Sequence, residues 1–126
     1  MRSRSSTRYI GAIDQGTTSS RFILFDHDGT IAYSHQLEHR QIFPQPGWVE
    51  HDGMEILQNT YTVIAETLKK AGAGADDIAG IGITNQRETI IAWDPETGIP
   101  YHNAIVWQDL RGTPIVDSLM AEGGID

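Results

Sequence analysis

The sequence contains no cysteine among its 126 residues, which excludes both a disulfide framework and a thiolate metal site. No stretch approaches the roughly 20 apolar residues that a membrane-spanning helix needs. Basic residues are also few: nine Lys and Arg stand against 17 Asp and Glu, for a net charge of -8. Nucleic acids and anionic membranes bind basic surfaces, so the charge argues against both as partners. These absences favour a cytoplasmic protein that binds small molecules.

Several common catalytic motifs are missing as well. There is neither a Walker A lysine motif nor a G-x-G-x-x-G fingerprint, and no serine lies in a G-x-S-x-G elbow. We assign the five histidines structural or surface roles. His35 and His39 are four residues apart in a predicted strand, a separation of about 13 Å that one ion cannot bridge. A glycosidase pair of Asp14 and Glu88 is a minor alternative, since nothing in the sequence sets their separation.

The residue pattern predicts a single α/β domain, or part of one, behind a flexible polar tail. Residues 1–8 are polar and basic with no apolar segment behind them, so they do not form a secretory signal, and the folded portion is expected over 9–126. Apolar runs between turn signals predict a mixed sheet with flanking helices. The expected elements are strands around Ile10–Ile13 and at Phe22–Phe25, Thr30–Glu38, Ile78–Thr84 and Ala104–Trp107, an extended run at Thr89–Trp93, and helices after Asp52 and over Thr113–Met120.

The helix after Asp52 has a capping-box pattern, because Glu55 lies three residues further on. Gly72 predicts its end. Apolar residues recur at helical spacing, and we expect this stripe to face the sheet: Met54, Leu57, Tyr61, Ile64, Ala65 and Leu68. Before the helix, residues 41–51 contain two prolines and a glycine, which predicts an ordered connector without regular structure, anchored by Phe43 and Trp48.

The first predicted hairpin ends its first strand in an acid, a glycine and a row of hydroxyls. Asp14 sits where the strand stops, and Gly16 suits a tight reversal. A carboxylate there can hold a divalent cation, while backbone N–H groups and hydroxyls face phosphate oxygens and a guanidinium adds positive charge. The side chains concerned are those of Thr17, Thr18, Ser19 and Arg21. The alternative is an ordinary hairpin whose residues serve only turn chemistry.

A second polar group follows the strand predicted at Ile78–Thr84. Asn85-Gln86-Arg87-Glu88 comes directly after it, and Gly80 and Gly82 alternate with isoleucines inside it. Strand glycines mark the close approach of a backbone or a ligand. Ligands of α/β sheets collect beyond strand ends, so both polar groups are candidate sites.

Four motifs in order carry a resemblance to a known family. They are Asp14 to Arg21 (DQGTTSSR), Pro46 to Asp52 (PGWVEHD), Gly82 to Thr89 (GITNQRET) and Asn103 to Gln108 (NAIVWQ). The chain from about Tyr9 onward resembles the FGGY carbohydrate kinases, most of all the members that phosphorylate glycerol. The resemblance implies the ribonuclease H-like fold shared with actin and hexokinase, here as an incomplete first domain.

The resemblance also implies a reaction and its site. It implies transfer of a phosphoryl group from ATP to glycerol with Mg²⁺, forming sn-glycerol 3-phosphate, and a homo-oligomer at full length. The residues at the family's functional positions are Thr17, Thr18, Ser19 and Arg21 for the nucleotide phosphates, Asp14 for magnesium, and Arg87, Glu88 and Trp107 for glycerol.

Two departures qualify the resemblance. Leu110 and Gly112 stand where the commoner version of the last motif has threonine. The family's enzymes are several times longer, and their catalytic base, a glycerol-site tyrosine and the adenine-binding half follow the stretch that matches this chain. We therefore expect the isolated chain to show no turnover. The alternatives are a non-catalytic, actin-like module that associates in response to nucleotide, and a kinase for another polyol or a pentulose.

Overall fold

The computed structural model describes residues 8–124, so all but the last residue of the predicted polar tail lies outside the described residues. The described chain divides into two compact units. The first unit contains the residues up to Arg40 together with Met54–Gln86. The second contains Gln41–Gly53 and the residues from Arg87 onward. Each unit is described by itself.

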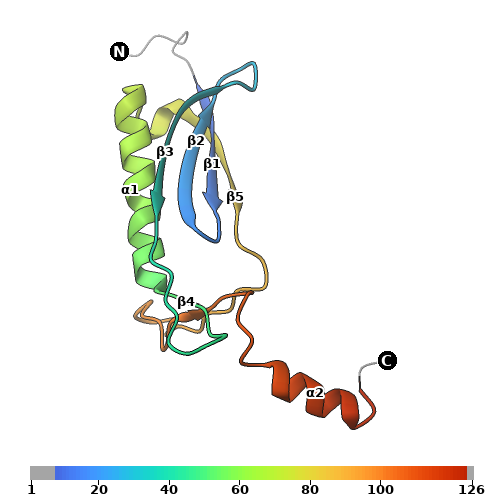
Figure 1. Ribbon diagram of the computed structural model, residues 1–126. Coiled ribbons are helices and arrows are strands. Elements are labelled where there is room, and N and C mark those ends of the chain that lie inside the picture. The colour runs from blue at the N-terminus through green and yellow to red at the C-terminus, as the bar shows by residue number, and fades with distance from the viewer. Residues whose placement is uncertain (1–7, 125–126) are drawn as a thin grey trace. The chain divides into compact units, whose positions relative to one another are not determined.

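The first unit is built on a mixed four-stranded sheet with the order β3-β2-β1-β5 (Figure 1). The strand β1 (Tyr9–Gln15) pairs antiparallel with β2 (Ser19–Phe25) and parallel with β5 (Ile78–Thr84), and β2 pairs antiparallel with β3 (Ile31–Glu38). The predicted mixed sheet is therefore confirmed. The carboxyl ends of β1 and β5 reach the same end of the sheet, since Asp14 pairs with Thr84.

The register of β1 and β2 divides their side chains between two faces. Phe22 lies opposite Ile13, and Leu24 lies opposite Gly11, so these residues share one face. Asp14 lies opposite Arg21 on the other face. The alternation thus separates the apolar residues of the hairpin from its charged pair.

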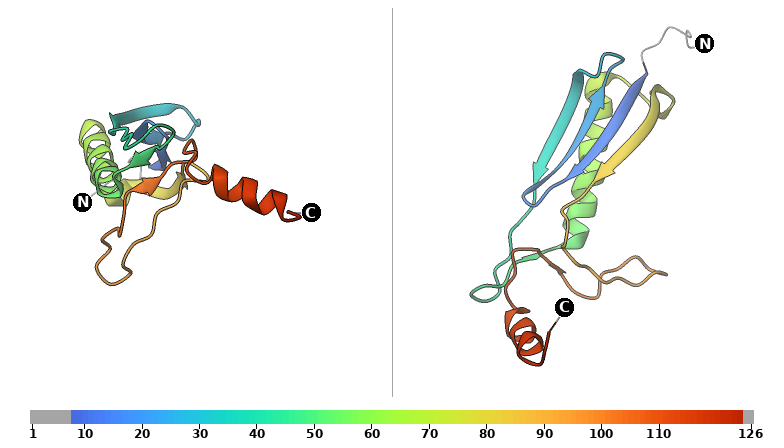
Figure 2. Two further views of the ribbon diagram at one scale, coloured as in Figure 1. Left: turned by 60° about the horizontal axis from the view of Figure 1, so that its bottom comes forward. Right: turned by 90° about the vertical axis from the view of Figure 1, so that its right-hand side faces the viewer.

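Helix α1 (Gly53–Ala71) covers the apolar face of the sheet, as Figure 2 shows. The core consists of Phe22, Leu24 and Val63, all at most 1% exposed. The expected stripe is only partly right: Ile64 and Leu68 border this core, but Leu57 is 39% exposed and Tyr61 is 60% exposed. The buried residues of α1 are Val63 and Thr67.

The two ends of α1 are set by local contacts. Near the start, the Glu55 carboxylate accepts a hydrogen bond from the Arg40 backbone N–H at 2.9 Å. At the end, Gly72 has a φ of 61° and follows the last helical residue, as the sequence predicts. A short 3-10 helix, Ala75–Asp77, then leads into β5.

The second unit consists mainly of loops around a small two-stranded sheet. Its strands are β4 (Glu50–His51) and β6 (Ala104–Ile105), and α2 (Thr113–Ala121) follows. The prediction of a connector without regular structure is wrong at its end, where β4 forms. Phe43 is 67% exposed and is not an anchor. The extended run predicted around Thr89–Trp93 makes isolated bridges instead of a strand.

Within residues 8–124, no helix is both long enough and apolar enough to cross a membrane.

Candidate functional site

The turn between β1 and β2 is closed by its own hydrogen bonds. The Gly16 N–H donates to the Ser19 carbonyl oxygen at 2.9 Å. The Gln15 side-chain amide donates to the Gly16 carbonyl at 2.9 Å, and the Ser20 hydroxyl donates to the Gln15 amide oxygen. These bonds fix the conformation of the turn, so that it presents its remaining groups in a fixed arrangement.

Two hydroxyl residues of the turn are also held by β3 and by His39, which follows it. The Ser19 hydroxyl accepts a hydrogen bond from the Gln36 amide at 2.7 Å. The Thr18 carbonyl accepts the His39 backbone N–H at 3.2 Å. Thr18 itself is exposed, and Thr17 and Ser19 are half-buried. The predicted phosphate-binding hydroxyls therefore lie together on one turn.

His39 lies behind this turn and is 6% exposed. Burial lowers the pKa of its imidazole, while the Thr17 backbone and the charge of Glu55 act in the opposite direction. The net depression favours a neutral ring, which agrees with the structural role predicted for this histidine.

The charged residues of the hairpin form a cross-strand pair. Arg21 Nη2 lies 3.3 Å from Asp14 Oδ2, and both side chains are 41% exposed. Such an exposed pair contributes at most about 1 kcal/mol to stability, so a ligand can displace the interaction between the two side chains at a small cost in free energy. The pair offers one accessible carboxylate and one guanidinium at the end of β1.

A single accessible carboxylate is typical of protein sites that bind Mg²⁺. The ion is commonly bound by one or two carboxylates, waters and substrate phosphates rather than by a full protein cage. Among the described residues, no group of three or more His, Asp or Glu side chains is arranged to hold a metal. The Asp14 carboxylate is thus one oxygen ligand of the kind that such a cation takes.

The second unit holds the turn with Arg87 and Glu88. Both residues are exposed, and Glu88 has a φ of 63°. Glutamate rarely adopts this left-handed conformation, which costs about 1–2 kcal/mol relative to the right-handed region. Strain of this kind is concentrated at functional sites, where the surrounding structure maintains it.

The structure brings Trp107 to this turn. The Trp107 backbone N–H donates to the Thr89 hydroxyl at 3.3 Å, and Thr89 directly follows Glu88. Ile90 and Ile105 exchange backbone hydrogen bonds of 3.0 and 2.9 Å beside this contact. The Trp107 residue is 51% exposed. The backbone of an aromatic residue therefore adjoins the turn that carries an acid and a guanidinium.

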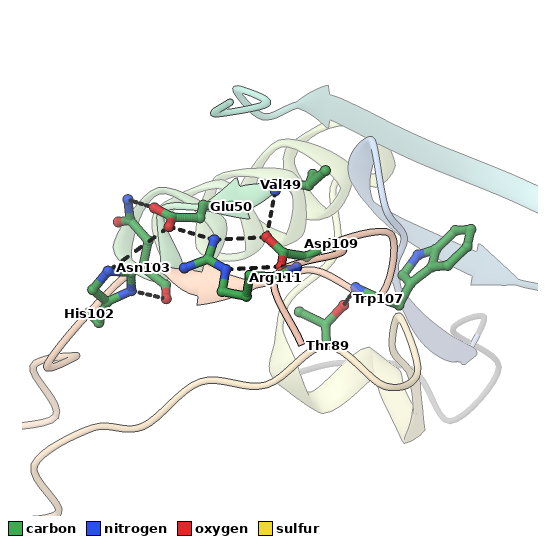
Figure 3. Close-up of polar contacts among 8 residues, drawn as sticks. All are labelled: Val49, Glu50, Thr89, His102, Asn103, Trp107, Asp109 and Arg111. Atoms are coloured by element: carbon green, nitrogen blue, oxygen red, sulfur yellow. Dashed lines mark hydrogen bonds and ion pairs between the residues drawn. The ribbon is translucent and has the colours of Figure 1, made fainter. Parts of the chain in front are cut away.

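Near Trp107, the second unit contains three charged side chains that we term the carboxylate–arginine cluster: Glu50, Asp109 and Arg111 (Figure 3). The sequence analysis did not predict this cluster. Arg111 Nη2 lies 2.8 Å from Glu50 Oε2 and 2.7 Å from Asp109 Oδ2, and Arg111 Nε donates to Asp109 Oδ1 at 2.9 Å. The D-x-R spacing was the one sequence signal for this cluster, because Asp109 and Arg111 are two residues apart and form a hydrogen bond with each other.

The contacts within the cluster shift all three pKa values. Hydrogen bonds from Arg111 hold the pKa of Asp109 well below its usual range, against the opposing effect of burial. The same guanidinium lowers the pKa of Glu50, and Asn103 adds to that effect. The hydrogen bond to Asp109 raises the pKa of Arg111. All three groups are therefore charged at neutral pH.

Comparison with protein families gives one match over the folded chain. The model of the "FGGY family of carbohydrate kinases, N-terminal domain" matches residues 9–126. Among curated relatives, the glycerol kinase of Leifsonia xyli subsp. xyli is 61% identical over 118 residues, which are 94% of this chain and 23% of the relative. The glycerol kinase of Haloferax volcanii is 56% identical over 122 residues, which are 97% of this chain and 24% of that enzyme.

Solved structures agree with these relatives. The Plasmodium falciparum glycerol kinase with ADP has a TM-score of 0.84 and 40% identity, over 92% of this chain and 23% of that one. The gluconate kinase from Lactobacillus acidophilus has a TM-score of 0.83 and 26% identity, over 94% of this chain and 23% of that one. The actin and hexokinase-like fold expected from the sequence is confirmed. The chain corresponds to less than a quarter of the length of these proteins.

Proposed function

We propose a function from the premise that this chain belongs to the FGGY family of carbohydrate kinases. The chain supplies part of an enzyme that transfers the γ-phosphoryl group of ATP to glycerol and forms sn-glycerol 3-phosphate. Phosphoryl transfer depends mainly on positioning and on neutralising the charge of the phosphates. The residues of both units can be assigned to those two tasks.

The hairpin of the first unit is assigned to the nucleotide. Backbone N–H groups and the hydroxyls of Thr17, Thr18 and Ser19 donate to phosphate oxygens, and Arg21 adds a forked positive charge. Asp14 holds Mg²⁺, which neutralises phosphate charge when it is bound. The exposed pairing of Asp14 with Arg21 supports this role, because both groups are accessible.

The turn of the second unit is assigned to glycerol. Arg87 and Glu88 pair with adjacent hydroxyls, and the Trp107 ring covers the carbon chain. One observation carries this proposal: the hydrogen bond from the Trp107 N–H to the Thr89 hydroxyl, which joins the aromatic residue to the Arg87–Glu88 turn. A chain with no polyol substrate has no need of this combination.

A hybrid enzyme tests the proposal. In the Leifsonia xyli kinase, residues 9–126 of this chain replace the matching 118 residues. We expect glycerol-dependent ADP release at about 1–100 per second, the usual range of kinases. Glu88→Gln should raise the KM for glycerol roughly 10- to 100-fold, because a desolvated partner group is left imperfectly paired. The isolated 126-residue chain, measured in parallel, should show no turnover.

Competition among substrates separates this proposal from its alternatives. The fold is shared with kinases of other substrates, including the gluconate kinase above. Gluconate and pentuloses should therefore compete poorly with glycerol in the hybrid. If nucleotide binding were unaffected by any polyol and promoted association instead, the actin-like assembly module would be the better assignment. A cytoplasmic location and a homo-oligomeric state remain predictions.

A further inference from the structure

The carboxylate–arginine cluster places three charges where water has little access. The side chains of Glu50 and Asp109 are 5% and 2% exposed, and that of Arg111 is 20% exposed. The Arg111 guanidinium also lies 3.9 Å from the centre of the Trp48 ring. Burying ions is expensive, and replacing such a cluster by apolar residues of similar volume is often neutral or stabilising. Stability alone is therefore a weak explanation for this arrangement.

The cluster holds the chain on both sides of Trp107. Before it, the Asn103 amide donates to Glu50 Oε1 at 3.1 Å. After it, Asp109 Oδ2 accepts the Val49 backbone N–H at 2.7 Å (Figure 3). Both contacts lead to consecutive residues of the same connector. The segment that carries the tryptophan is thus held at two points to one rigid base.

The backbone of the tryptophan is held between these two points. Its N–H is bonded to Thr89, while the residue as a whole is 51% exposed. An exposed indole on a fixed backbone is a pre-organised contact surface, because little conformational freedom remains to be lost when a ligand binds. Its position depends on the polar contacts that fix the segment.

We propose that Arg111, through Glu50 and Asp109, is a positioning residue that sets the place of Trp107 in the glycerol pocket. This inference rests on the proposed function and deepens it. Arg111 bonds to Glu50 and Asp109 and acts through the segment that carries the indole. The bidentate geometry toward Asp109 is what makes arginine the required cation.

Arg111→Lys tests the geometry while it keeps the charge. An ammonium is a point charge and cannot reproduce two parallel bonds to Asp109 and a third to Glu50. In the hybrid enzyme we expect the KM for glycerol to rise about tenfold, within the 100-fold that small misplacements can cause. The KM for ATP should change by less than about twofold, since the nucleotide residues lie on the hairpin of the first unit.

A double-mutant cycle with Trp107→Phe makes the test specific. If Arg111 acts through the indole, Arg111→Lys should change the glycerol KM much less in the Trp107→Phe background than in the parent. Arg40→Lys makes the same replacement at an exposed arginine of the first unit and should leave both KM values unchanged. A purely stabilising cluster would lower the amount of folded enzyme and its thermal midpoint without a selective change in the glycerol KM.

Amide hydrogen exchange on the 126-residue chain provides a second measurement that needs no activity. Arg111→Lys should accelerate exchange at the Trp107 and Asp109 N–H groups by about tenfold or more, with the amides of β2 as the internal control. Additive kinetic effects in the cycle, or unchanged exchange at these amides, would overturn the proposal. A hybrid that does not phosphorylate glycerol at all would refute the proposed function, and the exchange rates would still decide the role of Arg111.

Discussion

Replacing Gly11 by alanine should destabilise the first unit, although the same change in a strand usually stabilises. A Cβ atom at Gly11 would lie 2.7 Å from Cζ and 2.9 Å from Cε2 of the Phe22 ring. Carbon atoms in ordinary contact are about 3.5–4.0 Å apart, so the ring would have to withdraw by nearly 1 Å. Phe22 is 1% exposed and belongs to the core with Leu24 and Val63, so this movement would disturb the core packing.

The magnitude follows from two opposing effects. Overpacking of a core costs about 1–3 kcal/mol. Removing the conformational freedom of glycine from a strand returns about 0.5–1 kcal/mol. The net range is roughly 0–2.5 kcal/mol, and we expect Gly11→Ala to lower the free energy of unfolding by about 1 kcal/mol. The contact matters for the site because it packs β1 against β2 in the register that sets Asp14 opposite Arg21.

Urea unfolding of the 126-residue chain, followed by circular dichroism, measures this effect. Gly82→Ala is the matched control, because it lies on β5 of the same sheet and its added Cβ meets nothing within 4 Å. That variant should be neutral or up to about 1 kcal/mol more stable, the opposite sign. Phe22→Leu should suppress part of the Gly11→Ala defect. A Gly11→Ala chain with the wild-type midpoint and slope would refute the packing we describe.

Three further predictions concern pH and strain. Because the pKa values of Glu50 and Asp109 are lowered in the folded chain, the stability that these carboxylates contribute is fully present above their ordinary pKa values of 4.5 and 3.8. It is lost as the pH falls through the lowered pKa values. An acid titration followed by the amide signals of the second unit should show this loss, and the double variant Glu50→Gln, Asp109→Asn should show a weaker dependence on pH. Because the pKa of His39 is lowered in the folded chain, this imidazole is protonated at a higher pH in the unfolded chain, and the free energy of unfolding should fall as the pH drops below 6.5. His39→Gln should remove this pH dependence from urea midpoints measured between about pH 7 and pH 5. Glu88→Gly should be more stable than Glu88→Ala by about 1 kcal/mol, because only glycine adopts the φ of 63° without strain, yet both variants should lose glycerol-dependent activity in the hybrid enzyme.

Elements whose signals are local could be predicted from the sequence. The strand expected at Ile78–Thr84 has those bounds in the structure. The helix expected after Asp52 begins at Gly53 and ends directly before Gly72. Short apolar runs, capping patterns and glycines specify such elements within a few residues of the chain. The hairpin with Asp14 could be placed for the same reason.

The buried face of α1 could not be placed as well. Helical spacing identified an apolar arc that includes Leu57 and Tyr61, but the face that meets the core is centred on Val63 and Thr67. Periodicity shows that a helix has an apolar side, whereas the centre of the contact depends on where the sheet lies. Thr67 shows the difference, because its hydroxyl is satisfied by the Val63 carbonyl at 2.6 Å and it can be buried despite its polarity.

Only the Asp109–Arg111 part of the carboxylate–arginine cluster had a local signal. Glu50 and Arg111 are 61 residues apart in the sequence, and both lie in or beside loops without a period. Their pairing depends on how the connector of residues 41–51 and the segment after Trp107 fold against each other within the second unit. The motifs that contain them were visible, but nothing in those motifs predicted that these two residues would pair.

The residues proposed for the nucleotide and those proposed for glycerol therefore differ in how they indicate a function. In the hairpin, every residue also satisfies ordinary turn chemistry, and the pair of Asp14 and Arg21 is exposed, so its local structure fits a plain turn equally well. The second unit departs from local preference twice, in the left-handed Glu88 and in the buried charges around Arg111. A fold with no ligand to place would be expected to lose such departures, since glycine and apolar residues are available at lower free energy. A substrate site is thus supported most strongly beside Trp107, where local preferences are not followed, and the assignment of the hairpin to phosphates depends on it.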